Sequence, residues 1–331
     1  MDKLRIGIIG LGRGRGHAQR AAESERCELV SIADIQEDAA KEWAEKLEAG
    51  SSYKDYREML KEEELDAAII STPNHLHAPM SLDSMRAGLH VLVEKPMCNT
   101  MEEANEIVDV ARDTGRKLFV GYNYRWKPEY QKIDELLQGG AVGKLLYANS
   151  VIKTWRAKDY YRRAGWRTKW ETQGGGVLMN QATHHLDSLS WWMGEADTVI
   201  GYCENLYHDM EVEDTGTGII KFKSGATLNI MASTALQGST APPFEFSGTD
   251  AVLSYAMGGL VLKKKDADEW EKVEVSAEKV DTTMVQLDNF VDCVVNDTEP
   301  AVPAEQGRRA LELSIAIYES SKIGKPVKLP L

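Results

Sequence analysis

The chain has 331 residues, is 43% hydrophobic and carries a formal net charge of -13, which indicates a folded protein with room for two domains and argues against nucleic-acid binding. No apolar run reaches the roughly 18 residues of a membrane span, and the N-terminus reads as a strand instead of a signal sequence, so we expect a cytoplasmic protein that does not bind membranes. The four cysteines lie far apart, so neither a disulfide framework nor a metal cage is expected.

The first predicted elements form a βαβ unit with a glycine-rich turn. They are a strand over 4–9, a turn over 10–16, a helix over about 17–24 and a strand over 27–33. Gly10 and Gly12 would let backbone amides approach a pyrophosphate at a helix N-terminus. Asp34, directly after the second strand, can accept hydrogen bonds from an adenosine ribose and would repel a 2′-phosphate. This arrangement predicts a dinucleotide site that prefers NAD to NADP.

Other interpretations of these residues remain open. A glycine turn can serve local geometry alone, and here the third glycine of G-x-G-x-x-G is replaced by Arg15, between Gly14 and Gly16. Asp34 could instead cap a helix predicted over 35–47. Ile35 supplies no cation for a 2′-phosphate, although Arg13 and Arg15 could weaken the preference for NAD.

The next predicted strands bring a lysine to the edge of the sheet. A strand over 67–73 ends in a turn, a helix follows as far as residue 88, and a further strand covers 90–94. His75 and His77 form an H-x-H pair, which we interpret as loop packing instead of a metal site. Lys95 follows the last strand, in the crevice where open α/β sheets bind ligands, and Pro96 fixes the turn. The alternative for Lys95 is a surface salt bridge.

At this point the chain resembles the glucose-fructose oxidoreductase, inositol dehydrogenase and MocA family of nicotinamide-dependent sugar oxidoreductases. The resemblance rests on Glu94-Lys95-Pro96, supported by the segments 71–77, 121–126 and 174–187. Together with the glycine turn and Asp34, it predicts cofactor contacts from Gly10, Gly12, Arg13, Gly14, Arg15, Asp34, Ile35, Ser71, Thr72, Pro73, Asn74, His77, Glu94, Lys95, Asn123, Trp166 and Arg167.

The pattern of elements changes after about residue 122. We expect an NAD-binding Rossmann domain over 1–122 and a substrate-binding and oligomerisation domain over 123–331. The second is predicted to hold a large, mostly antiparallel open sheet, with strands over 147–154, 198–207, 216–222, 227–233, 244–248, 251–254 and 272–275. Helices over 130–138 and 183–192 should cover one face, leaving the other to solvent or to a homodimer or homotetramer contact. A final helix over 306–321 should pack between the domains.

The segment 174–187 carries the second set of candidate catalytic residues. At helical spacing Asn180, His184 and Asp187 can share one face. In the resembled family this segment commonly reads D-x-G-x-H-x-x-D, with the first acid and the histidine in the catalytic set. Here Asn180 replaces that acid and Ala182 replaces the glycine. Asparagine can hold a hydroxyl but cannot take its proton.

Hydride transfer from a carbinol carbon requires a base for the hydroxyl proton. We predict that His184 is this base, because histidine titrates near neutrality, and that Lys95 polarises and orients the hydroxyl. The reverse assignment stays open, as does an ordinary buried helix histidine for His184. His185 points off the shared face and is expected to pack.

The segment 153–170 is dense in aromatic and basic residues and is expected to be a loop over the cleft. Aromatic faces stack on sugar rings and arginines bind carboxylate or phosphate, which favours a uronate, a sugar phosphate or a nucleotide sugar. Dehydrogenases of UDP-linked amino-sugar uronates have a similar loop. Alternatively, Trp166 and Arg167 hold the cofactor or an oligomer contact. The predicted substrate contacts are Lys95, Asn123, Arg125, Trp155, Tyr160, Tyr161, Arg163, Asn180, His184 and Asp187.

Three functions therefore compete. The favoured one is an NAD-dependent dehydrogenase that acts on a secondary ring hydroxyl of a sugar or sugar derivative. The second, also implied by the resemblance, is a redox-neutral enzyme that keeps NAD bound and cleaves a glycoside. The third is a non-catalytic sensor that binds nucleotide and sugar.

Overall fold

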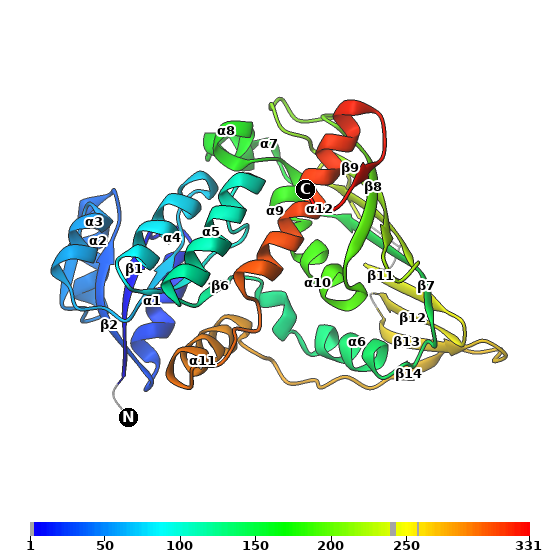
Figure 1. The fold of residues 1–331 in the computed structure, drawn as a ribbon, viewed down its shortest axis with the longest axis horizontal. Coiled ribbons are helices and arrows are strands. Elements are labelled where there is room, and N and C mark those ends of the chain that lie inside the picture. The colour runs from blue at the N-terminus through cyan, green and yellow to red at the C-terminus, as the bar shows by residue number, and fades with distance from the viewer. Residues whose placement is uncertain (1–2, 239–242, 257) are drawn as a thin grey trace. The chain divides into compact units, whose positions relative to one another are not determined.

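A computed structural model describes residues 3–238, 243–256 and 258–331 (Figure 1). Contacts between Cα atoms divide the chain into two compact units. The first unit contains residues up to Asn123 together with Asp281–Arg308, and the second contains Tyr124–Val280 and Arg309–Leu331. Residues 281–308 therefore belong with the first unit, although the sequence analysis assigned them to the second domain.

The packing of α11 (Thr282–Val295) explains this difference. Its Phe290 ring lies edge-on to Phe119, with the ring centroids 6.3 Å apart. Asp281, just before the helix, forms a 2.8 Å ion pair with Arg20. The amide of Val120 also donates to the carbonyl of Val302, which follows α11. These contacts all join distant parts of the sequence, so the pattern along the chain did not reveal them.

The first unit is built on a parallel sheet with the strand order β3-β2-β1-β4-β5-β6. The central strands are short and wholly apolar in their buried positions, as expected for strands covered on both faces. The strands are β1 (Leu4–Ile9), β2 (Cys27–Ala33), β3 (Ser51–Tyr53), β4 (Ala67–Ile70), β5 (His90–Val93) and β6 (Leu118–Val120). This order has its switch point between β1 and β4, where doubly wound sheets bind ligands.

The helices of the first unit connect these strands. They are α1 (Gly14–Glu23), α2 (Glu37–Lys46), α3 (Tyr56–Glu62), α4 (His77–Arg86) and α5 (Met101–Thr114), with the short η1 (Asn74–Leu76) before α4. A capping box between Thr100 and Glu103 begins α5, and Gly115 in the left-handed conformation ends it. The first helix begins at Gly14, three residues before the predicted start, so two glycines lie in its first turn.

The second unit contains a nine-stranded sheet in the order β14-β13-β12-β11-β7-β10-β9-β8-β15. All neighbouring strands are antiparallel except β7 and β10, which confirms the predicted mostly antiparallel sheet. The strands are β7 (Leu145–Lys153), β8 (Ala196–Glu204), β9 (Thr215–Phe222), β10 (Thr227–Ser233), β11 (Phe244–Gly248), β12 (Ala251–Ala256), β13 (Gly259–Lys264), β14 (Glu271–Val273) and β15 (Val327–Lys328). The sequence analysis did not predict β13 and β15.

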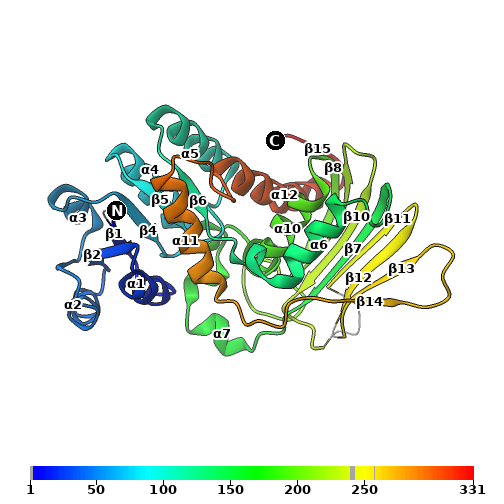
Figure 2. The same cartoon turned by 90° about the horizontal axis from the view of Figure 1, so that it is seen from below.

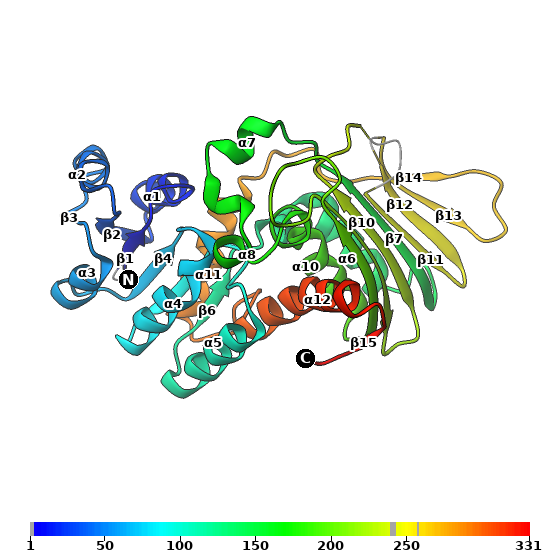
Figure 3. The same cartoon turned by 90° about the horizontal axis from the view of Figure 1, so that it is seen from above.

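One face of this sheet carries the core of the second unit. In β9 the burial alternates, so that Ile220 and Phe222 are buried and Ile219 and Lys221 are exposed. The buried face packs against α6 (Pro128–Gln138), α10 (Thr183–Met193) and α12 (Ala304–Ile323), whose side chains join the same core cluster (Figures 2 and 3). The first two helices are those predicted to cover this face. The division between the two units falls within α12.

Candidate functional site

The glycine-rich turn after β1 is shaped by the strand beside it. Gly10 has a φ of +92°, and a Cβ there would lie 2.7 Å from the Ser71 carbonyl oxygen, so the chain itself demands glycine. A Cβ on Gly12 would meet only that same oxygen, at 3.8 Å, so the chain does not demand glycine there. No acidic residue lies in the first turn of α1, and no side chain caps it. The Gly16 amide donates to the Arg13 carbonyl, and no acid or side-chain cap in this first turn opposes an anion at the start of α1.

Asp34 ties the glycine turn to the end of β2. Its Oδ2 accepts a 2.7 Å hydrogen bond from the Leu11 amide, and its Oδ1 accepts a 2.9 Å bond from the Gln36 amide. It does not cap α2, which begins at Glu37 after Gln36. The carboxylate is half-buried, and each oxygen retains lone-pair capacity, so Asp34 can also accept bonds from a ribose. Ile35, beside it, is 81% exposed.

The segment after β4 is joined to the segment after β5 by His77. The buried imidazole lies with Nε2 2.9 Å from the Thr72 carbonyl oxygen and Nδ1 2.7 Å from that of Pro96. Burial lowers the pKa of His77. The Lys95–Pro96 peptide bond is cis. His77 therefore holds the loop that carries Lys95 to the segment after β4. Lys95 itself is 9% exposed.

Glu94 fixes the other side of this loop. Its Oε1 lies 3.0 Å from His17 Nε2 and 3.7 Å from Arg13 Nε, and its Oε2 accepts a bond from the Lys95 amide. Burial alone would raise the pKa of Glu94, but the bond to His17 and the charges of Arg13 and Lys95 outweigh it and lower the pKa to about 2. An ionised Glu94 thus connects the first turns of α1 to Lys95.

The sequence analysis missed His17. In the sequence, His17 is a single histidine early in the helix that follows the glycine turn. That position does not indicate a contact with Glu94, which lies 77 positions away.

The remaining predicted residues of the first unit include both exposed and buried positions. Asn123 Nδ2 donates to the Thr282 hydroxyl at 3.2 Å. The Arg13 side chain is 63% exposed, and the Arg15 guanidinium lies 5.5 Å from the Trp43 ring centroid. Gly14 lies beside Ser71, whose Cβ would be 3.3 Å from an added Cβ. Pro73 precedes η1, and Asn74 is buried within it.

In the second unit, the predicted helical face is broken into two short pieces. Asn180 ends α9 (Val177–Asn180), and His184 lies in the first turn of α10. The buried His184 ring stacks on Tyr124 with the centroids 4.0 Å apart and the planes 10° from parallel. The Lys127 ammonium lies 3.2 Å from the Tyr124 centroid. His185 packs against Phe244, and burial lowers its pKa to about 3.

Arg125 and Asp187, both predicted to contact substrate, bind each other. Arg125 belongs to η2 (Asn123–Trp126), and its Nε and Nη2 donate to the two Asp187 oxygens at 2.8 and 2.6 Å. Both side chains are buried, and the guanidinium lies 4.9 Å from the Trp191 ring centroid. The pair fastens η2 to α10, so it supports His184 from the neighbouring turn.

The basic and aromatic segment is a series of short helices instead of the predicted loop. They are α7 (Lys158–Arg162), η3 (Gly165–Thr168) and α8 (Trp170–Gln173). The Tyr160 ring has the guanidinium groups of Arg156 and Arg167 at 5.3 and 5.1 Å, and Arg167 also lies 4.7 Å from Trp166. Tyr161 is buried and donates to Thr234. Trp155 and Arg163 are exposed.

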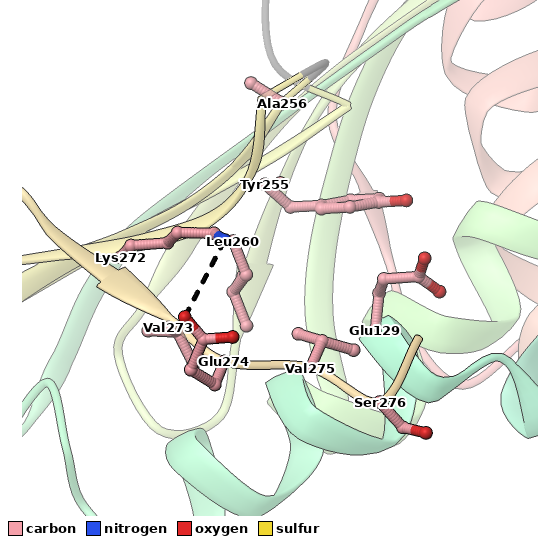
Figure 4. A pocket seen from close by; sticks show the side chains of 10 residues that line it. Glu129, Tyr255, Ala256, Leu260, Lys272, Val273, Glu274, Val275 and Ser276 are labelled. Atoms are coloured by element: carbon pink, nitrogen blue, oxygen red, sulfur yellow. Dashed lines mark ion pairs between the residues drawn. The ribbon is translucent and has the colours of Figure 1, made fainter. Parts of the chain in front are cut away.

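A pocket of about 340 Å³ lies elsewhere in the second unit, between β12, β13 and the segment after β14 (Figure 4). The Tyr255 ring lies across it, and Lys272 and Glu274 form a 3.7 Å ion pair at its edge (Figure 4). None of its lining residues is among those predicted from the sequence.

Two searches of the described residues found no further site. No group of three histidine, cysteine or acidic side chains within 3–238, 243–256 and 258–331 is arranged to hold a metal ion. In the same part of the chain, no helix has the length and apolar character to cross a membrane.

Comparison with known proteins covers nearly the whole chain. Residues 4–122 match the Gfo/Idh/MocA model described as an oxidoreductase family with an NAD-binding Rossmann fold, and residues 134–329 match the C-terminal alpha/beta domain of that family. The chain is 26% identical to myo-inositol 2-dehydrogenase of Thermotoga maritima over 98% of both proteins. It superposes with a TM-score of 0.89 and 28% identity on the WlbA dehydrogenase from Bordetella pertussis, solved in complex with NADH and UDP-GlcNAcA, over 100% of both chains.

A third relative differs in its reaction. The alpha-N-acetylgalactosaminidase of Shewanella oneidensis is 31% identical over 207 residues, which are 58% of this chain and 45% of that protein.

Proposed function

Since the chain belongs to the Gfo/Idh/MocA family of oxidoreductases, we propose that it transfers hydride between NAD and a secondary ring hydroxyl of a sugar or sugar derivative. The observation that carries this proposal is Lys95. It lies two residues after the end of β5, at the carboxyl edge of the parallel sheet of the NAD-binding first unit, and its loop is fixed on both sides by His77 and Glu94. Such rigid support is typical of a residue that must meet a reacting atom.

The residues of the first unit fit NAD. Gly12 and the uncapped start of α1 would hold the pyrophosphate, because no chain atom requires a glycine there and no acid opposes an anion. Asp34 would accept the ribose hydroxyls and disfavour a 2′-phosphate. When bound, NAD supplies the hydride acceptor.

The proton of the substrate hydroxyl needs a separate acceptor. The Lys95 ammonium, carried by the loop that the ionised Glu94 holds, donates to the hydroxyl oxygen and orients it. We assign proton removal to His184, whose ring is held by Tyr124. Asn180, which replaces an acid of the family pattern, would hold a hydroxyl without exchanging its proton. In the reverse assignment, Lys95 removes the proton and His184 orients the hydroxyl. That assignment predicts a different dependence of turnover on pH.

The chemistry around Tyr160 favours an anionic sugar. The ring offers a stacking surface, and Arg156 and Arg167 lie beside it with Arg163 exposed on the same segment. Guanidinium groups bind carboxylate and phosphate through paired hydrogen bonds. The WlbA dehydrogenase was solved with the nucleotide sugar UDP-GlcNAcA, which agrees with a uronate or a nucleotide sugar for this chain.

The test follows NADH absorbance while purified protein meets NAD and a panel of free sugars, inositols, uronates and nucleotide sugars, with a matched NADP series. We expect turnover with NAD on an anionic sugar and little with NADP. Turnover confined to neutral sugars would contradict the substrate class alone. Absence of turnover across the panel would contradict the dehydrogenase.

Redox-neutral glycoside cleavage is the second candidate, favoured by the Shewanella relative. It predicts that nucleotide stays bound through purification and that a chromogenic glycoside is cleaved without added NAD. A non-catalytic sensor would bind nucleotide and sugar without either reaction.

A homodimer or homotetramer is also proposed. The outward face of the large sheet carries neighbouring apolar side chains, with Ile200 paired to Ile219 and exposures of 43% and 51%. Tyr202, on the same face of β8, is 61% exposed. We expect light scattering to give more than one chain per particle, and Ile219→Asp to reduce that number.

A further inference from the structure

Two adjacent acids directly precede β9 (Thr215–Phe222), and neither was singled out from the sequence. Glu213 and Asp214 are 3% and 0% exposed. Their carboxylates accept hydrogen bonds from two different segments of the chain. Burying two carboxylates is costly unless each is fully hydrogen-bonded, so their partners identify their roles.

Glu213 organises the start of α9. Its Oε2 accepts from the Gly176 amide at 2.7 Å, its Oε1 accepts from the Leu178 amide at 2.9 Å, and its main-chain oxygen accepts from the Val177 amide. Three successive amides before Asn180 are thus held by one residue. The Tyr318 hydroxyl also donates to Oε1, at 2.8 Å. An added Cβ on Gly176 would overlap the main-chain oxygen of Glu213, so the glycine is required by this contact.

Asp214 organises the loop before β9. Its carboxylate accepts from the amides of Leu206, Tyr207 and His208 at 3.1, 2.7 and 2.9 Å. The His208 ring then lies against Tyr161, with centroids 4.7 Å apart. The pKa of Asp214 is lowered because these bonds to the carboxylate outweigh its burial, which raises it.

The two supported segments meet at one contact. Tyr161 packs edge-on to Tyr160, and the Tyr160 hydroxyl accepts from Asn180 Nδ2 at 3.5 Å. Asn180 ends the helix that Glu213 holds, and Tyr160 neighbours the ring that the Asp214 loop supports. A displacement of either segment would change the distance between these two side chains.

We propose that Glu213 and Asp214 form a positioning pair that sets the geometry of Asn180 and Tyr160, and through it the affinity for the sugar. The second half of this statement rests on the proposed function, in which Asn180 and Tyr160 face the substrate. The first half concerns the chain alone. Neither acid touches the reacting atoms, so each acts through the segment it holds.

Hydrogen exchange tests the positioning without any substrate. Glu213→Gln places an amide donor against backbone donors, so we expect exchange of the amides of 176–178 to rise at least tenfold while 206–208 stay protected. Asp214→Asn should give the opposite pattern. Glu204→Gln, an exposed acid at the end of the adjacent strand, is the control. Exchange in both variants equal to that of the control would overturn the positioning pair.

Steady-state kinetics test the link to the sugar. We expect Glu213→Gln to raise KM for the sugar about tenfold and to leave KM for NAD within twofold. In a Tyr160→Phe background the same substitution should have little further effect, because the two act through one contact. An unchanged KM for the sugar would overturn the proposed link between Glu213 and sugar affinity. Equal effects of Glu213→Gln in the wild type and in Tyr160→Phe would overturn it as well. If the wild type oxidises no sugar, the proposed function fails while the exchange result still decides the positioning.

Discussion

The two glycine-rich segments of the chain look alike in sequence, but Gly12 in the first and Gly175 and Gly176 in the second serve different ends. A Cβ added to Gly12 would meet only the Ser71 carbonyl oxygen, at 3.8 Å, so the small size of this glycine leaves space open to a ligand. Gly175 and Gly176 are required because Tyr318 and Glu213 occupy the space that a Cβ would take. A glycine run therefore indicates close approach, but only the neighbours reveal whether a ligand or the chain itself approaches.

The largest effect is expected from Gly176→Ala. Its Cβ would overlap the main-chain oxygen of Glu213, and that backbone cannot move without disturbing β9. Overpacking of this kind costs about 3 kcal/mol of unfolding free energy or more. Urea unfolding measures it, with Gly165→Ala as the control, because a Cβ there meets nothing within 4 Å. A midpoint equal to that of the control would contradict the packing role.

Lys95→Ala separates chemistry from cofactor binding. We expect turnover to fall by about 10²- to 10⁴-fold, because the substrate hydroxyl loses its donor, while NADH affinity stays within about twofold. Fluorescence titration with NADH and the NADH-absorbance assay measure the two quantities. Lys61→Ala, on the exposed face of α3, should change neither. Full activity in the Lys95 variant would refute the mechanism.

Gly12→Ala is the counterpart of Gly176→Ala in the first glycine segment. Since the chain offers space for the methyl group, we expect the unfolding midpoint to stay near that of the wild type and NADH affinity to fall about tenfold or more. If affinity were unchanged, the pyrophosphate would not lie over Gly12.

Asp34→Ala removes the acceptor of the Leu11 amide and the proposed acceptor of the ribose hydroxyls. We expect the affinity for NADH to fall about tenfold, and the ratio of NADH affinity to NADPH affinity to decrease. Parallel titrations with both nucleotides measure this, and Asp38→Ala, in the first turn of α2, serves as the control. A preference as large as in the wild type would assign the discrimination to other residues.

The smallest expected effect concerns Glu94 and pH. Its pKa in the folded chain, about 2, is below the ordinary 4.5, so the unfolded chain takes up the proton first as the pH falls. The stability that Glu94 contributes is complete above about pH 4.5 and is lost progressively toward pH 2. From pH 4.5 to 3.5 the wild type should lose about 1 kcal/mol more than Glu94→Gln. Parallel pH dependences would show that His17 and Arg13 do not hold the charge.

The sequence by itself determined the features that are contiguous or set by regular spacing. The strand, glycine turn and Asp34 of the first unit, the position of Lys95 after a buried strand and the mostly antiparallel second sheet all follow from local periodicity. The resemblance carried by Glu94-Lys95-Pro96 identified the family, which the comparisons show. These signals survive in one dimension because each depends on residues close together in the chain.

Only the tertiary structure decided which charged side chains bind other parts of the protein. Arg125 and Asp187 are 62 residues apart and neutralise each other, and His17 reaches Glu94 across 77 positions. Glu213 explains Gly176, 37 positions earlier. A buried charge needs a partner, and the fold can supply that partner from any part of the chain. The entropy cost of closing a loop rises only slowly with its length, so partners far apart in sequence are common. No local sequence pattern could therefore have identified these pairs.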